Sequence, residues 1–207
     1  MSAMGAIGDI TRHLDIGCGS TPRNPYQQTE AHGVDIAPAS ANSETGEFFR
    51  VANLSLVPIP HPDSSFDSIS ASEFLEHVLR VLPTADGKSS RFPFIELMNE
   101  ISRVLKPGGR FYAVTPAFPH PTAFHDPTHV NIITIGTWEY FCGDNALARM
   151  YGFSGQFDLL RNEWALHPEC FKAAPLTGWS AKWKRYRRTL RGTNSHVLWE
   201  FVCTKKA

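Results

Sequence analysis

An apolar strand that runs directly into a Gly-x-Gly turn, Leu14-Asp15-Ile16-Gly17-Cys18-Gly19, restricts the fold of this chain more than any other feature. Glycines at such a turn let the backbone bend tightly and approach a ligand closely. Short apolar runs punctuated by Gly and Pro continue along the chain and alternate with helical spacing, which is the order of a parallel α/β sheet. The turn therefore predicts a ligand crevice beside the first strand of an α/β fold.

The same periodicities predict the elements along the chain. Strands are expected at 12–16, 33–36, 47–51, 67–70, 110–115, 155–160 and 196–204. Apolar residues at helical spacing from Phe94 to Leu105 predict an amphipathic helix, which Lys106-Pro107-Gly108-Gly109 ends. A second helix is expected over 137–150. The interval between Gly19 and Asp35 is rich in proline, so a loop-like wall is expected there instead of a full helix.

The composition indicates one globular domain. The chain has 207 residues, and its 20 basic and 20 acidic side chains cancel, so it has no net charge to attract nucleic acid or an anionic membrane. Its four cysteines form no CxxC pair, and no stretch reaches 18 apolar residues. We expect a single cytoplasmic domain over 1–207 with no membrane partner, comprising core motifs at 13–116, an acceptor-side loop at 116–136 and a basic insertion at 170–195.

The glycine turn also discriminates between cofactors. A dinucleotide fingerprint would need a third glycine at position 22, where the chain has Pro22, so the cradle for a pyrophosphate is missing. Asp15 beside the turn suits a positively charged ligand. Asp35, at the end of the second expected strand, can accept hydrogen bonds from ribose hydroxyls. The alternatives are a turn that merely connects elements and an acid that caps a helix.

Four ordered segments carry a family resemblance. They are Leu14–Gly19, Val34-Asp35, Pro62–Ile69 leading to Leu75-Glu76-His77, and Arg103–Phe111. In this order the segments resemble the class I S-adenosylmethionine-dependent methyltransferase family over about residues 13 to 116. The resemblance implies a Rossmann-like α/β fold: a seven-stranded, mostly parallel sheet with helices on both faces and an antiparallel last strand. It also implies S-adenosyl-L-methionine as the cofactor of a methyltransferase.

The resemblance assigns cofactor contacts to particular positions. It implies that Asp15, Gly17 and Gly19 line the methionine part, that Asp35 holds the ribose, that Asn53 and Leu54 flank the adenine, and that Ser72 and Glu73 lie at the rim. Cys18, Ile36 and His77 complete the expected set. Many relatives have Asp where Asn53 stands. No activating base is evident beside Cys18, so we expect it to pack or line the site without acting as a nucleophile.

The segment after the fifth strand is expected to face the transferable methyl group. Thr115–Pro121 leads into His125-Asp126-Pro127-Thr128-His129, which is rich in rigid turns and titratable groups. Methyl transfer is an in-line displacement that needs a base when the acceptor is a hydroxyl. We expect His129 to be the general base, His125 or Asp126 to orient or bind, and the acceptor to be a small or glycan-like molecule methylated at oxygen.

Two other classes of function stay open. Imidazole and carboxylate are suitable metal ligands, so His120, His125, Asp126 and His129 are an alternative metal-dependent site. The chain is alternatively a regulatory protein that binds S-adenosylmethionine without turnover. Loop histidines that only cap or hydrogen-bond locally are a third, structural interpretation.

Residues 170–199 form a segment of locally positive charge, although the whole chain has no net charge. Residues 170 to 199 contain no acid, and Trp179, Trp183 and Tyr186 interleave with seven bases: Lys172, Lys182, Lys184, Arg185, Arg187, Arg188 and Arg191. Such a composition can meet phosphate, a nucleotide-linked sugar or single-stranded nucleic acid, or it can be a solvated basic face. The sequence after the fourth strand, Ser70–Phe74, lacks a [DN]PPY-like motif, so nucleic acid is a disfavoured acceptor.

Overall fold

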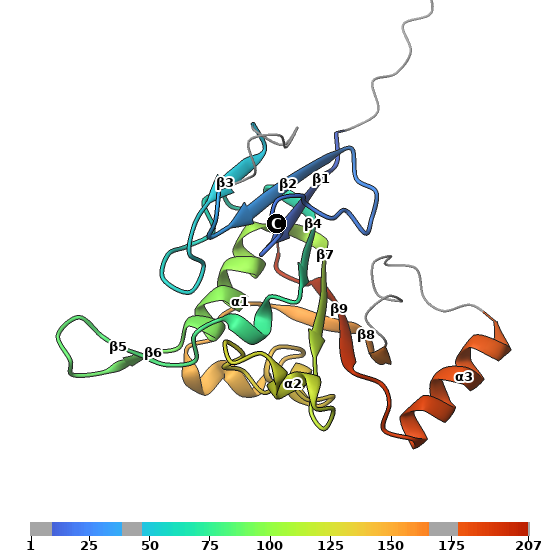
Figure 1. The fold of residues 1–207 in the computed structure, drawn as a ribbon. Helices are drawn as coiled ribbons and strands as arrows, with labels where there is room; N and C mark the ends of the chain where they lie inside the picture. Colours follow the sequence, from blue (N-terminus) through green and yellow to red (C-terminus); the bar gives the residue numbers. More distant parts are fainter. Residues whose placement is uncertain (1–9, 39–46, 166–177, 207) are drawn as a thin grey trace, which may run out of the picture.

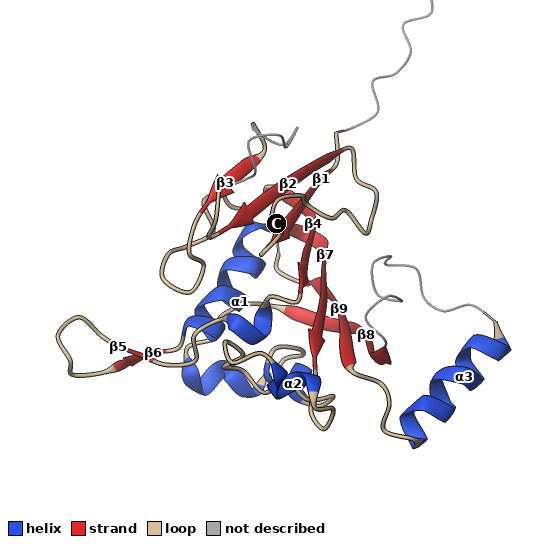
Figure 2. Cartoon of the chain, viewed as in Figure 1, coloured by secondary structure: helices blue, strands red, loops and turns tan. Residues whose placement is uncertain are grey.

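The computed structural model describes residues 10–38, 47–165 and 178–206, and it contains one seven-stranded sheet (Figures 1 and 2). The spatial order is β3-β2-β1-β4-β7-β9-β8. The strands are β1 (Arg12–Ile16), β2 (Glu30–Asp35), β3 (Phe49–Val51), β4 (Phe66–Ser72), β7 (Leu105–Pro116), β8 (Phe157–Ala165) and β9 (His196–Cys203). Strands β1, β2, β3, β4 and β7 pair in parallel, whereas β9 pairs antiparallel with both of its neighbours, β7 and β8. The Rossmann-like α/β fold with an antiparallel last strand is therefore confirmed.

Helix α1 (Pro93–Val104) packs its apolar side against the sheet because Leu97, Met98, Ile101 and Val104 recur at helical spacing and are buried. Pro93 occupies the first turn, where its missing N–H costs nothing. The next strand, β7, begins directly at Leu105, five residues earlier than the sequence indicated. The register of β7 against β4 shifts at residues 106–109, because Leu105 pairs with Phe66 and Arg110 pairs with Ser68.

The expected helix over 137–150 is wrong. Two short 3₁₀ helices stand in its place, η2 (Thr137–Tyr140) and η3 (Leu147–Tyr151). Between them Gly143 has a φ of 79°, and its N–H donates to the carbonyl of Phe157 at 2.8 Å. This long-range bond and the left-handed glycine take the backbone out of helical geometry.

The two faces of the sheet have different chemistry. One face and α1 enclose the main core, which includes Leu14, Ile16, Phe111, Trp199 and Phe201. On the other face His13, Asp15, Ser68 and Ser70 form a buried polar row: Ser70 Oγ donates to Asp15 Oδ1 at 2.5 Å, and the His13 ring nitrogens lie 2.8 Å from the two serine hydroxyls. Desolvation and His32 lower the pKa of His13 to about 3, so its ring is neutral.

The loop between β1 and β2 covers this polar row. The backbone N–H of Arg23 donates to Asp15 Oδ2 at 2.7 Å, and the Tyr26 hydroxyl donates to Glu200 Oε1 on β9 at 2.8 Å. Residues 17 to 29 contain no helix, as the proline content predicted. Further along the same face, α3 (Trp179–Leu190) is tied to β8 by an ion pair between Arg185 and Glu163.

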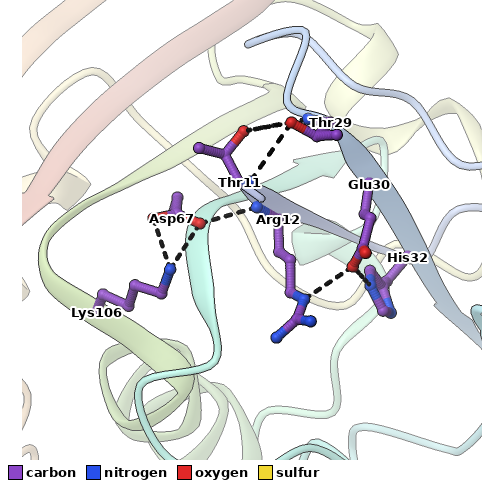
Figure 3. A network of polar contacts seen from close by, with 7 residues as sticks. All are labelled: Thr11, Arg12, Thr29, Glu30, His32, Asp67 and Lys106. Atoms are coloured by element: carbon purple, nitrogen blue, oxygen red, sulfur yellow. Dashed lines mark hydrogen bonds and ion pairs between the residues drawn. The ribbon is translucent and has the colours of Figure 1, made fainter. Parts of the chain in front are cut away.

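The beginnings of the strands are joined by a polar network at the end of the sheet away from the loops that follow β1 and β2 (Figure 3). The Asp67 carboxylate on β4 accepts from the N–H of Arg12 on β1 at 2.8 Å and from Lys106 Nζ on β7 at 2.8 and 2.9 Å. Arg12 Nε also donates to Glu30 on β2 at 2.8 Å. These contacts fix the beginnings of β2, β1, β4 and β7, four consecutive strands of the sheet, relative to one another.

The remaining elements are short. They are the hairpin strands β5 (Leu82–Pro83) and β6 (Ser90–Arg91), the 3₁₀ helix η1 (Leu75–His77) and the one-turn helix α2 (Thr122–His125). None of the helices in the described ranges has both the length and the apolar character needed to cross a bilayer. Cys170 and Lys172 of the basic segment lie outside the described residues.

Candidate functional site

The loops that follow β1, β2, β3 and β4 enclose a cleft of about 270 Å³ at the carboxyl ends of these parallel strands. It is lined by Gly17, Val34, Asp35, Ile36, Ala52, Asn53, Leu54, Ser55, Glu73, Phe74 and His77. Seven residues of the expected cofactor set come together here: Gly17, Asp35, Ile36, Asn53, Leu54, Glu73 and His77. Ligands of open α/β sheets bind at this edge, so the cleft is the candidate cofactor site.

The glycine turn is attached to the cleft through Asp35. Gly17 and Gly19 have φ values of 66° and 61°, a conformation that side chains other than glycine rarely adopt. The Gly17 N–H donates to the carbonyl of Val34 at 2.8 Å, and the Gly19 N–H donates to Asp35 Oδ2 at 2.8 Å. Asp35 Oδ1 accepts from the N–H of Ala37 at 3.0 Å. The carboxylate is thus fixed at the junction of the turn and β2.

Four residues of the expected cofactor set do not line the cleft. Asp15 projects to the polar face, where its carboxylate meets Ser70 and the loop above β1, and burial raises its pKa to about 6. Cys18 is 7% exposed, and burial raises the pKa of its thiol to about 12, which fits packing and opposes a nucleophilic role. Ser72 is buried, and Gly19 reaches the cleft only through its bond to Asp35.

Glu73 is held in an uncommon backbone conformation beside the cleft. Its φ is 53°, although it is neither Gly nor Asn, and its N–H donates to the carbonyl of Val114 at 2.9 Å. Its carboxylate Oε1 lies 3.0 Å from Nε2 of His196 on β9. Such conformations persist where surrounding bonds fix them, as at ligand sites.

The acceptor-side loop brings His129 against the cleft residue His77. Their ring centroids lie 4.8 Å apart at 74°. His129 Nδ1 lies 3.2 Å from the carbonyl oxygen of Ala123. A carbonyl oxygen can only accept, so Nδ1 carries the hydrogen and Nε2 of a neutral His129 has a free lone pair.

Asp126 fixes the His77 ring through Thr128. The Thr128 hydroxyl donates to Asp126 Oδ1 at 2.7 Å, and this bond together with one from the Thr128 N–H holds the pKa of Asp126 below its usual range. The Thr128 oxygen must then accept from His77 Nδ1 at 2.9 Å, which leaves His77 Nε2 as a second lone-pair nitrogen. Asp126 therefore acts through Thr128. His125, at the end of α2, is not part of this arrangement.

Glu76 is the residue of this site that the sequence interpretation missed. Its side chain is 1% exposed, and burial raises its pKa to about 8. Oε2 accepts from the Thr115 hydroxyl at 3.0 Å, whereas Oε1 is buried with no hydrogen-bond partner in the described part of the chain. No local sequence signal marks Glu76 as buried, because residues 130–131, far along the chain, donate to its backbone carbonyl.

The alternative metal quartet does not assemble. Among the described side chains, the group that could hold a metal ion is Glu76, His77 and His129, whose ligating atoms all lie within 4.8 Å of one another. Of these three residues, only His129 belongs to the alternative metal quartet His120, His125, Asp126 and His129. His120 is instead bound through Nδ1 to the Thr122 hydroxyl at 2.9 Å, and the carboxylate of Asp126 is occupied by Thr128.

A larger cavity of about 410 Å³ lies beside the same loop. Its lining is mostly apolar or aromatic, with Arg80, Asn131 and Thr137 as the polar members. The other lining residues are Val81, Phe92, Phe94, Ile95, Ile132, Ile133, Tyr140, Phe141 and Tyr151. Asn131 fixes one wall, because its Nδ2 donates to the carbonyls of Leu75 and Val78 at 2.9 and 2.5 Å. The cavity shares no lining residue with the cofactor cleft.

Comparisons with known proteins agree with this geometry. A family model described as a methyltransferase domain matches residues 14–113. No curated protein matches the sequence.

Solved structures share the fold along nearly the whole chain. A chain of the Haloferax volcanii complex between the Trm112 methyltransferase activator and a methyltransferase is 20% identical, with a TM-score of 0.57 over 95% of this chain and 84% of that one. A SAM-dependent methyltransferase from Archaeoglobus fulgidus is 17% identical, with a TM-score of 0.55 over 93% and 86%. Geranyl diphosphate C-methyltransferase from Streptomyces coelicolor, solved with Mg²⁺, geranyl diphosphate and S-adenosyl-L-homocysteine, is 16% identical, with a TM-score of 0.50 over 93% and 71%.

Sheet order, cleft and family match together define a class. Residues 14–113 form a methyltransferase domain, and this chain is an enzyme, a methyltransferase that uses S-adenosyl-L-methionine. The lining of the cleft suits this cofactor, since it combines a carboxylate with apolar side chains and contains no Lys or Arg to hold a pyrophosphate.

Proposed function

We propose that the chain methylates an oxygen atom of a small-molecule or glycan-like acceptor, with His129 as the general base. The observation that supports this proposal most directly is the free lone pair on His129 Nε2 beside His77, which itself lines the cofactor cleft. A base at this position is near the end of the cleft where the acceptor must approach.

In this proposal the residues of the cofactor cleft and His129 have separate roles. Asp35 accepts from the ribose hydroxyls, while Ile36, Asn53 and Leu54 surround the adenine. When bound, S-adenosylmethionine supplies an electrophilic methyl group on a sulfonium sulfur. His129 receives the acceptor's proton at Nε2 as the new oxygen–carbon bond forms and the carbon–sulfur bond breaks.

The orienting residues follow from the hydrogen bonds around the base. The Ala123 carbonyl fixes the His129 ring, and Asp126 fixes His77 through Thr128. We assign His125, which stands on the exposed end of α2, to acceptor binding. The buried, free thiols of Cys18, Cys142 and Cys203 support a reducing compartment such as the cytoplasm.

Substitution of His129 tests the role of the base. His129→Gln should lower turnover about 100-fold or more, the usual contribution of a positioned base, while S-adenosylmethionine binds with unchanged affinity. The readout is S-adenosylhomocysteine release with a panel of hydroxylated acceptors, and His120→Gln in the same loop is the matched control. Full turnover by His129→Gln would remove His129 from the mechanism. Cofactor binding without turnover on any acceptor would favour the regulatory alternative.

A second candidate function is metal-assisted methyl transfer at Glu76, His77 and His129. Glu76 Oε1, which has no hydrogen-bond partner among the described residues, lies with the two imidazoles in a group of ligating atoms within 4.8 Å of one another, which suits a divalent cation once Glu76 loses its proton. Such a cation would acidify an acceptor hydroxyl and replace the base. Stoichiometric metal in the purified protein, lost in both Glu76→Gln and His129→Gln, would favour this candidate, whereas full activity after chelation would exclude it.

A further inference from the structure

Helix α3 carries its apolar side chains on the surface that faces solvent. Trp179, Trp183, Tyr186 and Leu190 recur at i, i+4, i+7 and i+11, so they share one side of the helix. Their side chains are 84%, 52%, 54% and 69% exposed. We call these four residues the aromatic stripe. Figure 1 shows α3 standing away from the sheet at the edge formed by β8.

The side of α3 that faces the protein is polar. Ala181, Arg185 and Arg188 are half-buried, and Arg185 forms the ion pair with Glu163 on β8. A surface helix of a globular protein normally has the opposite arrangement, with its apolar side on the core and its charges in solvent. The aromatic stripe is therefore unpartnered within the described chain and fits a contact outside it.

The charges around the stripe have a single sign. Helix α3 contains no Asp or Glu, and Lys182, Lys184, Arg187 and Arg191 are exposed on or just after it. By helical geometry Lys182 and Arg187 flank the stripe on its two sides. The partner of this surface must therefore be anionic as well as able to bury aromatic and aliphatic side chains.

We propose that α3 binds the surface of an anionic phospholipid bilayer, with the aromatic stripe at the boundary between headgroups and acyl chains. Basic amphipathic helices with Trp on the apolar side lie in this plane, and Trp and Tyr favour the membrane interface. Such a helix lies on a bilayer, so the contact does not require a membrane-spanning segment.

Two other partners fit the stripe less well. Single-stranded nucleic acid binds by stacking bases on exposed ring faces. Here the rings stack on one another, at 6.3 Å and 7° for Trp179 with Trp183 and at 5.7 Å and 28° for Trp183 with Tyr186, and Leu190 offers no stacking surface. A two-fold contact between two copies of α3 would bring like charges together.

Vesicle binding by the full chain tests this proposal. The protein should co-sediment with vesicles of equal parts phosphatidylcholine and phosphatidylserine at least tenfold more strongly than with phosphatidylcholine alone, and the Trp emission should shift to the blue. Trp179→Ser/Trp183→Ser should lose most of this binding, and Lys182→Gln should weaken it about fivefold, as expected for the loss of one charge near an anionic surface. Met150→Ser, which removes a side chain that is 77% exposed elsewhere, should bind like wild type.

The same samples provide the outcomes that would overturn the proposal. Calorimetric binding of S-adenosylmethionine by every variant shows that the fold is intact. No difference between the two kinds of vesicle would contradict the proposal. Stripe-dependent capture of a single-stranded oligonucleotide without vesicle binding would assign the surface to nucleic acid, and stripe-dependent dimerisation without vesicle binding would assign it to a second copy.

Discussion

Substitution of Gly17 by alanine should disable the cofactor cleft for two separable reasons. The first is backbone strain, because Gly17 has a φ of 66° and an L-residue in this conformation costs about 1–2 kcal/mol. The second is steric. A Cβ on Gly17 would lie 2.7 Å from Cβ of Phe74 and closer still to the Phe74 ring, which lines the same cleft.

Gly19 is the matched control for this substitution. Its φ is 61°, but nothing lies within 4 Å of the position that its Cβ would take. Gly19→Ala should therefore cost only the backbone term, about 1–2 kcal/mol. Gly17→Ala adds overpacking of about 1–3 kcal/mol and should destabilise the protein by about 2–5 kcal/mol in total.

Urea denaturation and calorimetric titration with S-adenosylmethionine measure the two consequences. Gly17→Ala should unfold at a lower urea concentration than Gly19→Ala. It should also bind S-adenosylmethionine at least tenfold more weakly, because Phe74 must move within the cleft to relieve the clash. In the double variant Gly17→Ala/Phe74→Ala the steric part should be recovered, so the two substitutions should cost less together than the sum of their separate costs. Equal stability and affinity of Gly17→Ala and Gly19→Ala would refute the steric reasoning.

Two further predictions concern stability. Burial, followed by the neighbouring cationic groups, lowers the pKa of His61 from 6.5 to about 4, so only the unfolded state takes up this proton as the pH falls from 6.5 to 4. The free energy of unfolding should decrease across this window, and His61→Phe, which retains the ring packed against Phe66, should flatten the decrease in urea midpoints between pH 7 and pH 4.5; an unchanged slope would contradict the assignment. In the network of Figure 3, Lys106→Met should cost at most about 1 kcal/mol, because it removes one ion pair that is still partly open to solvent. Asp67→Ala should cost about 2 kcal/mol, because the Arg12 N–H also loses its acceptor, and equal costs would show that this bond contributes nothing.

The parts of the fold that the sequence predicted well are those in which local signals agree. The strand before Gly17 and the segment from Phe94 through Lys106 each combine a clear period with a glycine or proline that ends it. The 137–150 segment lacks this agreement. Its structure depends on the bond between Gly143 and Phe157, two residues far apart in sequence, and no local period reports such a bond.

The candidate site was predictable in position but not in every side chain. The order of the motifs placed Asp35 at the end of β2 and Glu73 directly after β4, the two parallel strands on either side of β1, and the structure brings both residues to one cleft. Asp15 could have been assigned to the opposite face from strand alternation, because Leu14 and Ile16 on either side of it are apolar. Glu76 could not, because its burial is completed by residues 130–131, whose N–H groups donate to its backbone carbonyl at 2.8 and 3.0 Å.

The central claim is that the cleft beside Gly17 and Asp35 holds the adenosyl cofactor. Calorimetric titration with S-adenosylmethionine and S-adenosylhomocysteine tests it most directly, with NAD as the control ligand and the exposed Asp144→Ala as the control variant. We predict saturable binding of both adenosyl ligands and none of NAD. Asp35→Ala should weaken the binding at least tenfold, because it removes hydrogen bonds to a charged acceptor. Absence of binding to folded protein, or equal affinity in Asp35→Ala, would contradict the account.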